Sequence, residues 1–323
     1  MAIRQNSVTL CPGFTVTNRD TVLDLGCGGG ETCVRAGQVG ATVIALDVDR
    51  ANLKHAQARM NGIPARSFRA LQSDCDPIPM RDGSVTAVIA QEVLEHVRDP
   101  RRLVAEMIRV GSAEARYLIA VPDSLSEDLI ALVADPSYFQ PPNHIHVFDR
   151  CEIESILTDA GLDIVSRSFA DFYSSLWWLF SIASSPHHSR NWPSCRGKPT
   201  GQEASSHLVQ LWEKTWREFS QNGGSDVVAS MLDSRIPKSQ IYVAQKRGQP
   251  CCIRPPDIHN EDIRSENESL RRENENLRQD REALRKKLQR LLASRSWRFT
   301  GPLRRSKDVV LRFLEFVNSR RTE

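Results

Sequence analysis

The chain has 323 residues, a length that accommodates one α/β domain and an additional segment. Hydrophobic residues make up 40% of it, which is enough for a buried core, and the formal net charge is only +3. Residues 294–323 hold eight Arg or Lys against three Asp or Glu, so the rest of the chain is slightly acidic. This distribution of charge argues against a nucleic-acid partner for the main body of the protein.

The cysteines and the apolar segments set further limits. The eight cysteines include no C-x-x-C pair and no Cys/His ligand spacing, so we expect reduced thiols and no metal site. The N-terminus has no apolar signal core, and the longest apolar stretch, about residues 176–183, is far shorter than the roughly 20 residues of a membrane span. We therefore expect a cytoplasmic protein whose membrane contact, if it has one, is peripheral and at the inner face of the cytoplasmic membrane.

Residues 1–20 predict no clear element, and the first informative stretch is residues 22–30, Val-Leu-Asp-Leu-Gly-Cys-Gly-Gly-Gly. Its apolar residues predict a short buried strand, and its glycines predict a turn whose backbone N–H groups can approach a ligand closely. Residues 31–39 can continue as a helix with its N-terminus aimed at that ligand. The dinucleotide fingerprint G-x-G-x-x-G does not fit, because its third glycine position is occupied by Glu31 or Cys33.

The pattern that does fit is Asp-x-Gly-x-Gly-x-Gly, carried by Asp24, Gly26, Gly28 and Gly30. A carboxylate at Asp24 would repel a pyrophosphate, but it suits a cationic ligand that bears an amino group. This pattern resembles the first motif of the class I S-adenosylmethionine-dependent methyltransferases of type 11/12. The resemblance implies a Rossmann-like α/β fold with a seven-stranded, mostly parallel sheet whose last strand is antiparallel. It also implies S-adenosyl-L-methionine as the cofactor, with Asp24 facing its methionine amino end.

A second buried strand is predicted over residues 41–46, and it ends at Asp47. Asp47 lies about twenty residues past the glycines, where an α/β nucleoside site places a carboxylate on the ribose hydroxyls. Asp49 is a weaker candidate for that contact and a better one for the N-cap of a helix over residues 50–61. After the third strand, the resemblance assigns Asp74 to the adenine amino group; the alternative is a local turn bond within the loop.

The predicted fourth strand, residues 85–90, runs into Gln-Glu-Val-Leu-Glu-His-Val at positions 91–97. This stretch resembles the "vLEHv" segment of the same family, and the resemblance makes Gln91 a cofactor-binding residue. It places His96 at the mouth of the cofactor site, although His96 could equally cap or pack a helix. The family usually has an Asp near the start of this strand, where this chain has Thr86.

The later elements follow the same order as in that family. They are helices from about residue 103 and over residues 150–160, and strands at 117–122, 162–169 and 240–246. In the family, the last two of these strands pair antiparallel at the edge of the sheet. Between them, His144 and His146 are the best candidates for a general base, which a hydroxyl acceptor would need. Their alternation places the two rings on opposite sides of an extended segment, and we favour His144 as the catalytic residue. Packing alone would also explain either histidine.

Residues 170–239 form a long insertion between the last two strands. It is rich in Trp and Phe, and it is too long for a loop without structure, so we expect helices with an aromatic face. The insertion either shapes the acceptor pocket as a lid or simply packs over the edge of the sheet. With it, the methyltransferase domain would span residues 1–247.

The remaining residues predict an appendage in three parts. A linker at 248–262 is followed at 263–293 by apolar residues at every seventh position, which is typical of a coiled coil that pairs two copies of the chain. A single solvated helix is the alternative. Residues 294–323 begin with a segment that resembles one found after coiled coils in bacterial enzymes of surface-polysaccharide assembly. They continue as a basic amphipathic helix, suited to an anionic membrane surface or to a protein partner.

Together these features predict a methyltransferase that O-methylates a sugar of a bacterial surface polysaccharide or of its lipid-linked precursor. One alternative is a small-molecule O- or C-methyltransferase of the quinone-pathway kind. A second alternative is a non-catalytic scaffold whose coiled coil carries the function. The expected partners are a glycan or small-molecule acceptor, a second copy of the chain and an anionic membrane, but no nucleic acid.

Overall fold

The computed structural model describes residues 6–132, 134–184, 207–221 and 225–248. The chain divides into two units, Met1–Pro250 and Cys251–Glu323, and all described residues belong to the first. The predicted coiled coil and basic tail, and all but the first residue of the predicted linker, lie outside the described residues.

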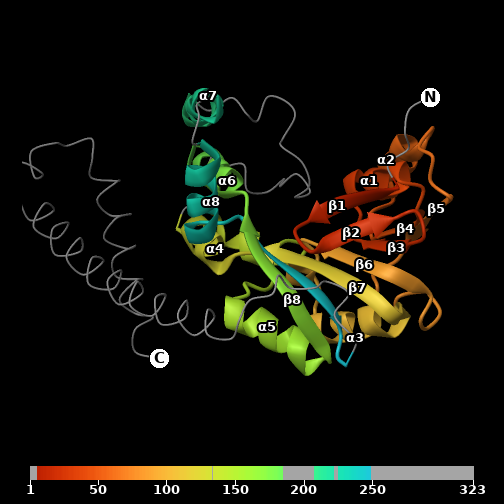
Figure 1. Ribbon diagram of the computed structural model, residues 1–323. Coiled ribbons are helices and arrows are strands. Elements are labelled where there is room, and N and C mark those ends of the chain that lie inside the picture. The colour runs from red at the N-terminus through yellow and green to blue at the C-terminus, as the bar shows by residue number, and fades with distance from the viewer. Residues whose placement is uncertain (1–5, 133, 185–206, 222–224, 249–323) are drawn as a thin grey trace, which may run out of the picture. The chain divides into compact units, whose positions relative to one another are not determined.

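A seven-stranded sheet forms the centre of the first unit, with the spatial order β5-β4-β3-β6-β7-β9-β8 (Figure 1). Its strands are β3 (Thr21–Leu25), β4 (Thr42–Asp47), β5 (Ser67–Gln72), β6 (Val85–Gln91), β7 (Gly111–Pro122), β8 (Leu162–Ala170) and β9 (Ser239–Lys246). Strands β3 to β7 pair in parallel, and β9 is antiparallel to both of its neighbours. The predicted Rossmann-like α/β fold with an antiparallel last strand is thereby confirmed.

The helices cover both faces of this sheet. They are α1 (Glu31–Gln38), α2 (Arg50–Met60), α3 (Pro100–Val110), α4 (Ser124–Ala131), α5 (Arg150–Asp159), α6 (Phe172–Ser184), α7 (His207–Ser220) and α8 (Ser225–Arg235), with the 3-10 turns η1 (Leu94–His96) and η2 (Pro136–Phe139). Figure 1 shows α1 and α2 on one side of the sheet and α3 and α5 on the other. Alternate residues of β3 enter the two cores: Val22 packs with α1 and α2, and Leu23 packs with α3 and α5.

Aspartates stand at the start of several of these helices. Asp49 accepts a hydrogen bond from the backbone N–H of Ala51 at the start of α2, which confirms the predicted cap. Asp99, Asp123 and Asp149 begin α3, α4 and α5 in the same way. Each side chain satisfies a backbone donor that the first turn of the helix leaves without an internal partner.

A two-stranded hairpin precedes the sheet, where the sequence predicted no element. Strands β1 (Ser7–Cys11) and β2 (Phe14–Thr17) pair antiparallel, and Phe14 and Val16 are fully buried in the core beside α1 and α2. The hairpin therefore closes one flank of that core.

Asp20 joins the hairpin to the sheet. One of its carboxylate oxygens accepts hydrogen bonds from the backbone and the hydroxyl of Thr17, at 2.7 and 2.9 Å. The other accepts from the Thr86 hydroxyl at 2.8 Å and from the Arg116 guanidinium at 2.6 Å. Thr86, at the position where the resemblance led us to expect Asp, thus donates to the carboxylate of the residue just before β3.

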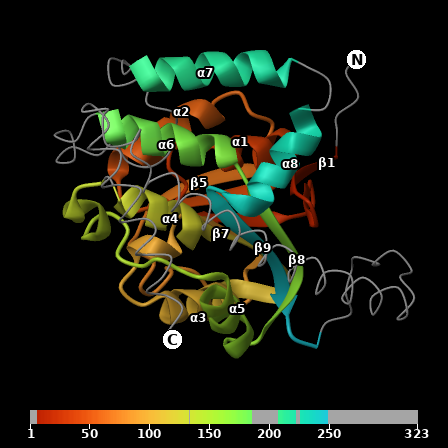
Figure 2. The same ribbon diagram turned by 90° about the vertical axis from the view of Figure 1, so that its left-hand side faces the viewer.

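The described part of the insertion contains the helices α6, α7 and α8, which pack on one another (Figure 2). Aromatic side chains of α6 and α7 cluster there: the Tyr173 and Trp212 rings stack with centroids 5.7 Å apart, and the Trp177 indole donates to Glu213. The expectation of helices with an aromatic face is confirmed. Among the described helices, none has both the length and the apolar character needed to cross a membrane.

The insertion leaves and rejoins the sheet at one place. Its flanking residues Ala170 and Ser239 are paired partners in β8 and β9, and Ser239 also pairs with Pro122 at the end of β7. These positions lie at the carboxyl edge of the parallel strands. In open α/β sheets, ligands bind at that edge, at the point where the strand order reverses. Here that point is β3, from which the chain adds β4 and β5 on one side and β6 and β7 on the other.

Candidate active site

The glycine turn between β3 and α1 has the conformation that its composition predicts. Gly26, Gly28 and Gly30 have φ values of 56°, 49° and 79°, in the left-handed region that side chains other than glycine rarely adopt. A Cβ added at Gly30 would lie 2.7 Å from the Cβ of Ala56, so the turn also packs directly against α2. The turn therefore has no side chains that would keep a ligand from its backbone, and at Gly30 it packs directly against α2.

Asp47 holds this glycine turn against the end of β4. Its carboxylate is 5% exposed and accepts a hydrogen bond from the backbone N–H of Gly28 at 2.8 Å. It also accepts from the Asp49 backbone at 2.9 Å and from the Asn52 side-chain amide at 3.2 Å. A carboxylate offers about four acceptor positions, so Asp47 retains capacity for a ligand hydroxyl while it anchors the turn.

Asp24 lies in β3 immediately before the turn and is buried. Its carboxylate accepts a hydrogen bond from the thiol of Cys33 in α1 at 3.1 Å. The hydrogen bond with Cys27, burial and the charge of Asp24 raise the pKa of the Cys33 thiol, which keeps that thiol a neutral donor. The structure thus brings two buried carboxylates to the same turn: Asp24 lies just before it, and Asp47 contacts its middle at Gly28.

Gln91 ends β6, which neighbours β3, and Asp74 lies in the loop after β5, one strand beyond β4. The Gln91 side-chain carbonyl accepts from the Thr32 hydroxyl at 3.1 Å, which ties the end of β6 to the first turn of α1. Asp74 is exposed in the loop after β5 and accepts from the Asp76 backbone at 3.2 Å. That contact is the local turn bond weighed as the alternative role of Asp74, and it leaves most of the carboxylate accessible.

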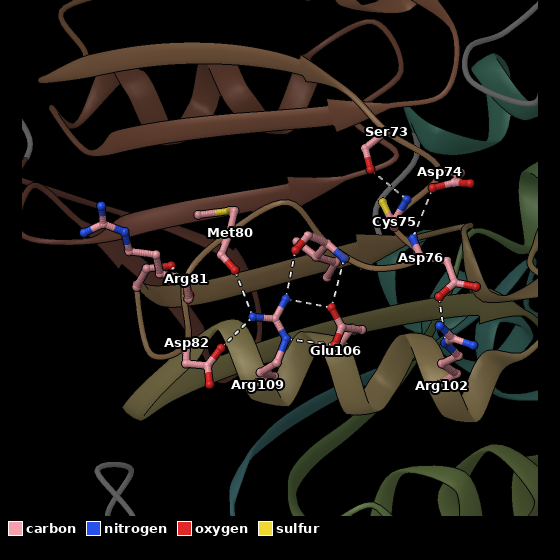
Figure 3. A network of polar contacts seen from close by, with 12 residues as sticks. Ser73, Asp74, Cys75, Asp76, Met80, Arg81, Asp82, Arg102, Glu106 and Arg109 are labelled. Carbon is pink, nitrogen blue, oxygen red and sulfur yellow. Dashed lines mark hydrogen bonds and ion pairs between the residues drawn. The ribbon is translucent and has the colours of Figure 1, made fainter.

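The loop that carries Asp74 is fixed to α3 (Figure 3). Arg109 donates to the backbone carbonyls of Ile78 and Met80, both at 2.8 Å, and to the carboxylate of Asp82 at 2.6 Å. Glu106 accepts from Arg109 at 2.7 Å and from the Ile78 backbone N–H at 2.9 Å. One guanidinium therefore holds several points of the segment between β5 and β6.

A second polar group of side chains lies beyond the end of β6. Glu92 has φ 54° and forms an ion pair with Lys238 at 2.6 Å and a hydrogen bond with the Ser239 hydroxyl at 2.7 Å. Burial opposes its ionisation, but the charge and hydrogen bond of Lys238 outweigh burial and lower the pKa of Glu92. This pair links the end of β6 to the place where the insertion rejoins the sheet.

His144 lies beside that pair and is 2% exposed. Its Nδ1 lies 2.8 Å from the carboxylate of Glu127, itself 1% exposed, which also accepts from the Tyr138 hydroxyl at 3.2 Å. Since a carboxylate accepts, the neutral ring carries its proton on Nδ1 and its lone pair on Nε2. His146, by contrast, donates through Nε2 to the Val97 carbonyl at 3.0 Å and stacks on Phe148, which is a packing role.

Glu95 and His96 face His144 from the turn η1. Glu95 is fully buried, and within the described part of the chain neither of its carboxylate oxygens has a hydrogen-bond partner. Burial and the nearby charge of Glu92 raise the pKa of Glu95 to about 8. The rings of His96 and His144 are 5.0 Å apart between centroids and meet edge to face. The sequence drew attention to His96 but not to Glu95, because the partners of Glu95 come from distant segments.

This arrangement defines a class, a doubly wound α/β domain with a glycine turn and buried carboxylates at its topological switch point. Comparison with known proteins names the class more closely. Residues 23–119 match the family described as "Methyltransferase domain". Norajmaline N-methyltransferase of Rauvolfia serpentina is 35% identical over 226 residues, which cover 67% of this chain and 68% of that protein. The chain belongs to the S-adenosylmethionine-dependent methyltransferases, whose methyl donor is S-adenosyl-L-methionine.

Other relatives match over shorter spans. A probable S-adenosylmethionine-dependent methyltransferase of Mycolicibacterium smegmatis is 28% identical, over 44% of this chain and 52% of that protein. A ubiquinone biosynthesis O-methyltransferase of Rhizobium rhizogenes is 29% identical, over 48% of this chain and 64% of that protein. The chain spans about half the length of the first of these relatives. A solved geranyl diphosphate methyltransferase with bound donor is 18% identical and superposes with a TM-score of 0.46, over 72% of this chain and 79% of that one.

Proposed function

We propose that this protein transfers the methyl group of S-adenosyl-L-methionine to a hydroxyl oxygen of a sugar in a bacterial surface polysaccharide or in its lipid-linked precursor. The observation that carries the methyl-transfer part is the glycine turn with two buried carboxylates beside it, Asp24 and Asp47. The glycan part is supported by the tail segment at residues 294–304, through its resemblance to enzymes of polysaccharide assembly.

The proposed donor site uses each of the residues gathered at this edge of the sheet. Gly26, Gly28 and Gly30 leave the backbone open to the donor, and Asp24 faces the amino group of its methionine end. Asp47 holds the ribose, Asp74 the adenine amino group, and Gln91 completes the site beside α1. The donor supplies an electrophilic methyl group, so the work of the protein is to align an oxygen with it and to exclude water.

His144 is the proposed residue that acts on the acceptor proton. Its hydrogen bond to Glu127 holds the ring in the tautomer whose Nε2 can accept a proton. The insertion starts and ends at the same edge of the sheet, so we infer that α6, α7 and α8 enclose the acceptor. The pocket that they cover would then keep water from the reacting oxygen.

Two further parts of the proposal rest on sequence alone. We infer that residues 263–293 pair two copies of the chain and that residues 294–323 attach them to the anionic inner face of the cytoplasmic membrane. Flotation with anionic liposomes tests the second part: the full chain should float, and a chain without residues 294–323 should not. Equal flotation of the two would refute membrane attachment.

The experiment that tests the acceptor is methyl transfer from isotopically labelled donor, read by mass spectrometry. Lipid-linked bacterial glycans form one set of acceptors and catechols of the quinone pathway the other, since the ubiquinone relative makes a small-molecule acceptor the second candidate. Label on a sugar oxygen supports the proposal, and label on the catechols alone replaces it with the second candidate. Failure of the purified protein to bind the donor in a calorimetric titration would refute the enzymatic function itself.

A further inference from the structure

We propose that Glu95, His96 and His144 bind a divalent transition-metal ion that holds the hydroxyl group of the acceptor. One ligand atom from each of these residues lies within 4.8 Å of the others. This inference rests on the proposed methyl transfer to oxygen and concerns how the acceptor is bound and activated. It changes the part played by His144, whose Nε2 becomes a ligand of the ion instead of a free base.

The first argument is the burial of Glu95. Its side chain is 0% exposed, and within the described part of the chain no other residue donates a hydrogen bond to its oxygens. A buried carboxylate in that state is costly unless a cation or a set of donors compensates it. Lys238, whose charge acts on Glu95, is already paired with Glu92 at 2.6 Å. Nε2 of His96 lies 3.7 Å from a Glu95 carboxylate oxygen, which is beyond hydrogen-bond distance.

The second argument is the orientation of both histidines. Nδ1 of His96 lies 3.0 Å from the Asn143 carbonyl and 3.2 Å from the Pro142 carbonyl, so it must donate. Nδ1 of His144 donates to Glu127. Each ring therefore has its lone pair on Nε2. Ligand histidines usually donate their other N–H to a backbone carbonyl or a carboxylate in this way, which fixes the tautomer and the ring orientation.

The third argument is that the backbone holds the ligands together although they are far apart along the chain. The Glu95 carbonyl accepts hydrogen bonds from the backbone N–H groups of Ile145 and His146, at 2.8 and 3.2 Å. The turn η1 and the segment that carries His144 are thus joined at the site itself. The loop cannot move away from Glu95 without breaking both bonds.

The composition of the site indicates the kind of ion and its use. Two imidazoles and one carboxylate favour ions such as Zn²⁺, Co²⁺ or Mn²⁺ over Mg²⁺, and three protein ligands leave a position open for an exchangeable oxygen. An acceptor hydroxyl bound there has a lowered pKa and releases its proton to the solvent as it binds. Its oxygen then forms a bond to the methyl carbon as the carbon–sulfur bond breaks, and that electron pair stays on sulfur as the neutral thioether.

The ion itself provides the direct test. The full chain is stripped with a chelator and titrated with Zn²⁺, Co²⁺, Mn²⁺ or Mg²⁺ by calorimetry, and donor binding is measured on the same stripped sample. We expect one transition-metal ion per chain, a visible absorption band for the Co²⁺ form, and donor binding with or without the ion. Donor binding without any ion binding would overturn the metal site and leave the methyltransferase proposal intact. No donor binding would instead refute the proposed function.

Variants locate the ion. Glu95→Gln and His96→Ala should each abolish stoichiometric ion binding and retain donor binding, which also reports that the domain is folded. Glu127→Gln, which removes the charge behind His144, should weaken ion binding by about 10- to 100-fold. His55→Ala is the control, because His55 is an exposed histidine on α2, and it should change nothing. An ion stoichiometry unchanged by both Glu95→Gln and His96→Ala would overturn the assignment.

Discussion

The backbone N–H of Gly28 donates to the carboxylate of Asp47 at 2.8 Å, so one side chain both anchors the glycine turn and faces the proposed ribose position. Donor binding should therefore depend on the charge at this position. Removing the charge weakens both the hydrogen bond to Gly28 and the proposed hydrogen bonds to the ribose. Asparagine at position 47 has nearly the same shape and volume as aspartate but carries no charge.

Asp47→Asn should raise the Kd for S-adenosyl-L-methionine by about tenfold or more, since hydrogen bonds to a charged group contribute about 1.5–3 kcal/mol. Titration calorimetry measures this change. Asp49→Asn is the matched control, because Asn caps a helix as well as Asp does, and its Kd should stay within about twofold. Equal effects of the two substitutions would contradict a ligand role for Asp47.

The close packing of Gly30 on α2 predicts that Gly30→Ala destabilises the fold more than Gly62→Ala, although the two glycines have nearly equal φ. A Cβ at Gly30, with φ 79°, meets Ala56 at 2.7 Å, whereas a Cβ at Gly62, with φ 80°, meets nothing within 4 Å. Both Gly→Ala changes carry the cost of a left-handed residue, about 1 kcal/mol, and only Gly30→Ala adds an overlap of about 1–3 kcal/mol. Urea denaturation of both variants checks this. A loss of stability no greater for Gly30→Ala would show that the turn is not packed as described.

Arg109 should control the loop that carries Asp74. Arg109→Lys cannot reach two carbonyls and two carboxylates at once, so we expect a loss of about 1–2 kcal/mol and a several-fold rise in the Kd for the donor. Arg102→Lys is the control, because the pair of Arg102 with Asp76 is exposed and such pairs contribute little. If Arg109→Lys lowers stability without changing donor affinity, Asp74 has no part in donor binding.

Asp20 predicts a stability change at acid pH. Burial raises the pKa of its carboxyl, but the hydrogen bonds from Thr17 and Thr86 and the charge of Arg116 prevail and hold the pKa below its ordinary value. A lowered pKa in the folded state means that this contribution is present above the unfolded value, about 3.9, and is lost as the pH falls through the folded value. Asp20→Asn should therefore cost about 1.5–3 kcal/mol at pH 7 and progressively less below pH 4.

Denaturation of wild type and Asp20→Asn at several pH values measures this convergence. Asp163→Asn, at the exposed pair with Arg247, should show little difference from wild type at any pH. A constant gap between wild type and Asp20→Asn from pH 7 to pH 3 would mean that the Asp20 charge does not stabilise the fold.

The sheet and the glycine turn were predictable because their signals are local. Short apolar runs ending in Gly or Asp mark β3 and β4, and the left-handed turn needs glycine at fixed positions. The hairpin β1–β2 was missed because its strands are short and half exposed, although Pro12-Gly13 is a turn signal between them. Helix α4 was missed as well, and β7 begins at Gly111, earlier than the strand predicted over residues 117–122.

The site divides in the same way. The residues of the donor side follow strands directly, so their order along the chain predicts their meeting at one edge. The contacts among Glu95, His144, Glu127 and Lys238 depend instead on the paths of two long connections. The hydrophobic periodicity of the sequence does not predict the course of such connections. The one local sign was an acid next to His96 in a segment that ends a buried strand.

Because Ala170 and Ser239 are neighbours in the sheet, the seventy or so residues between them begin and end at a single seam. A segment of different length or sequence can join Ala170 to Ser239 while every strand of the sheet keeps its partners. If the insertion encloses the acceptor as proposed, evolution can replace it without changing the sheet. A chimaera spliced at these two residues should then inherit its fold from one parent and its substrate range from the other.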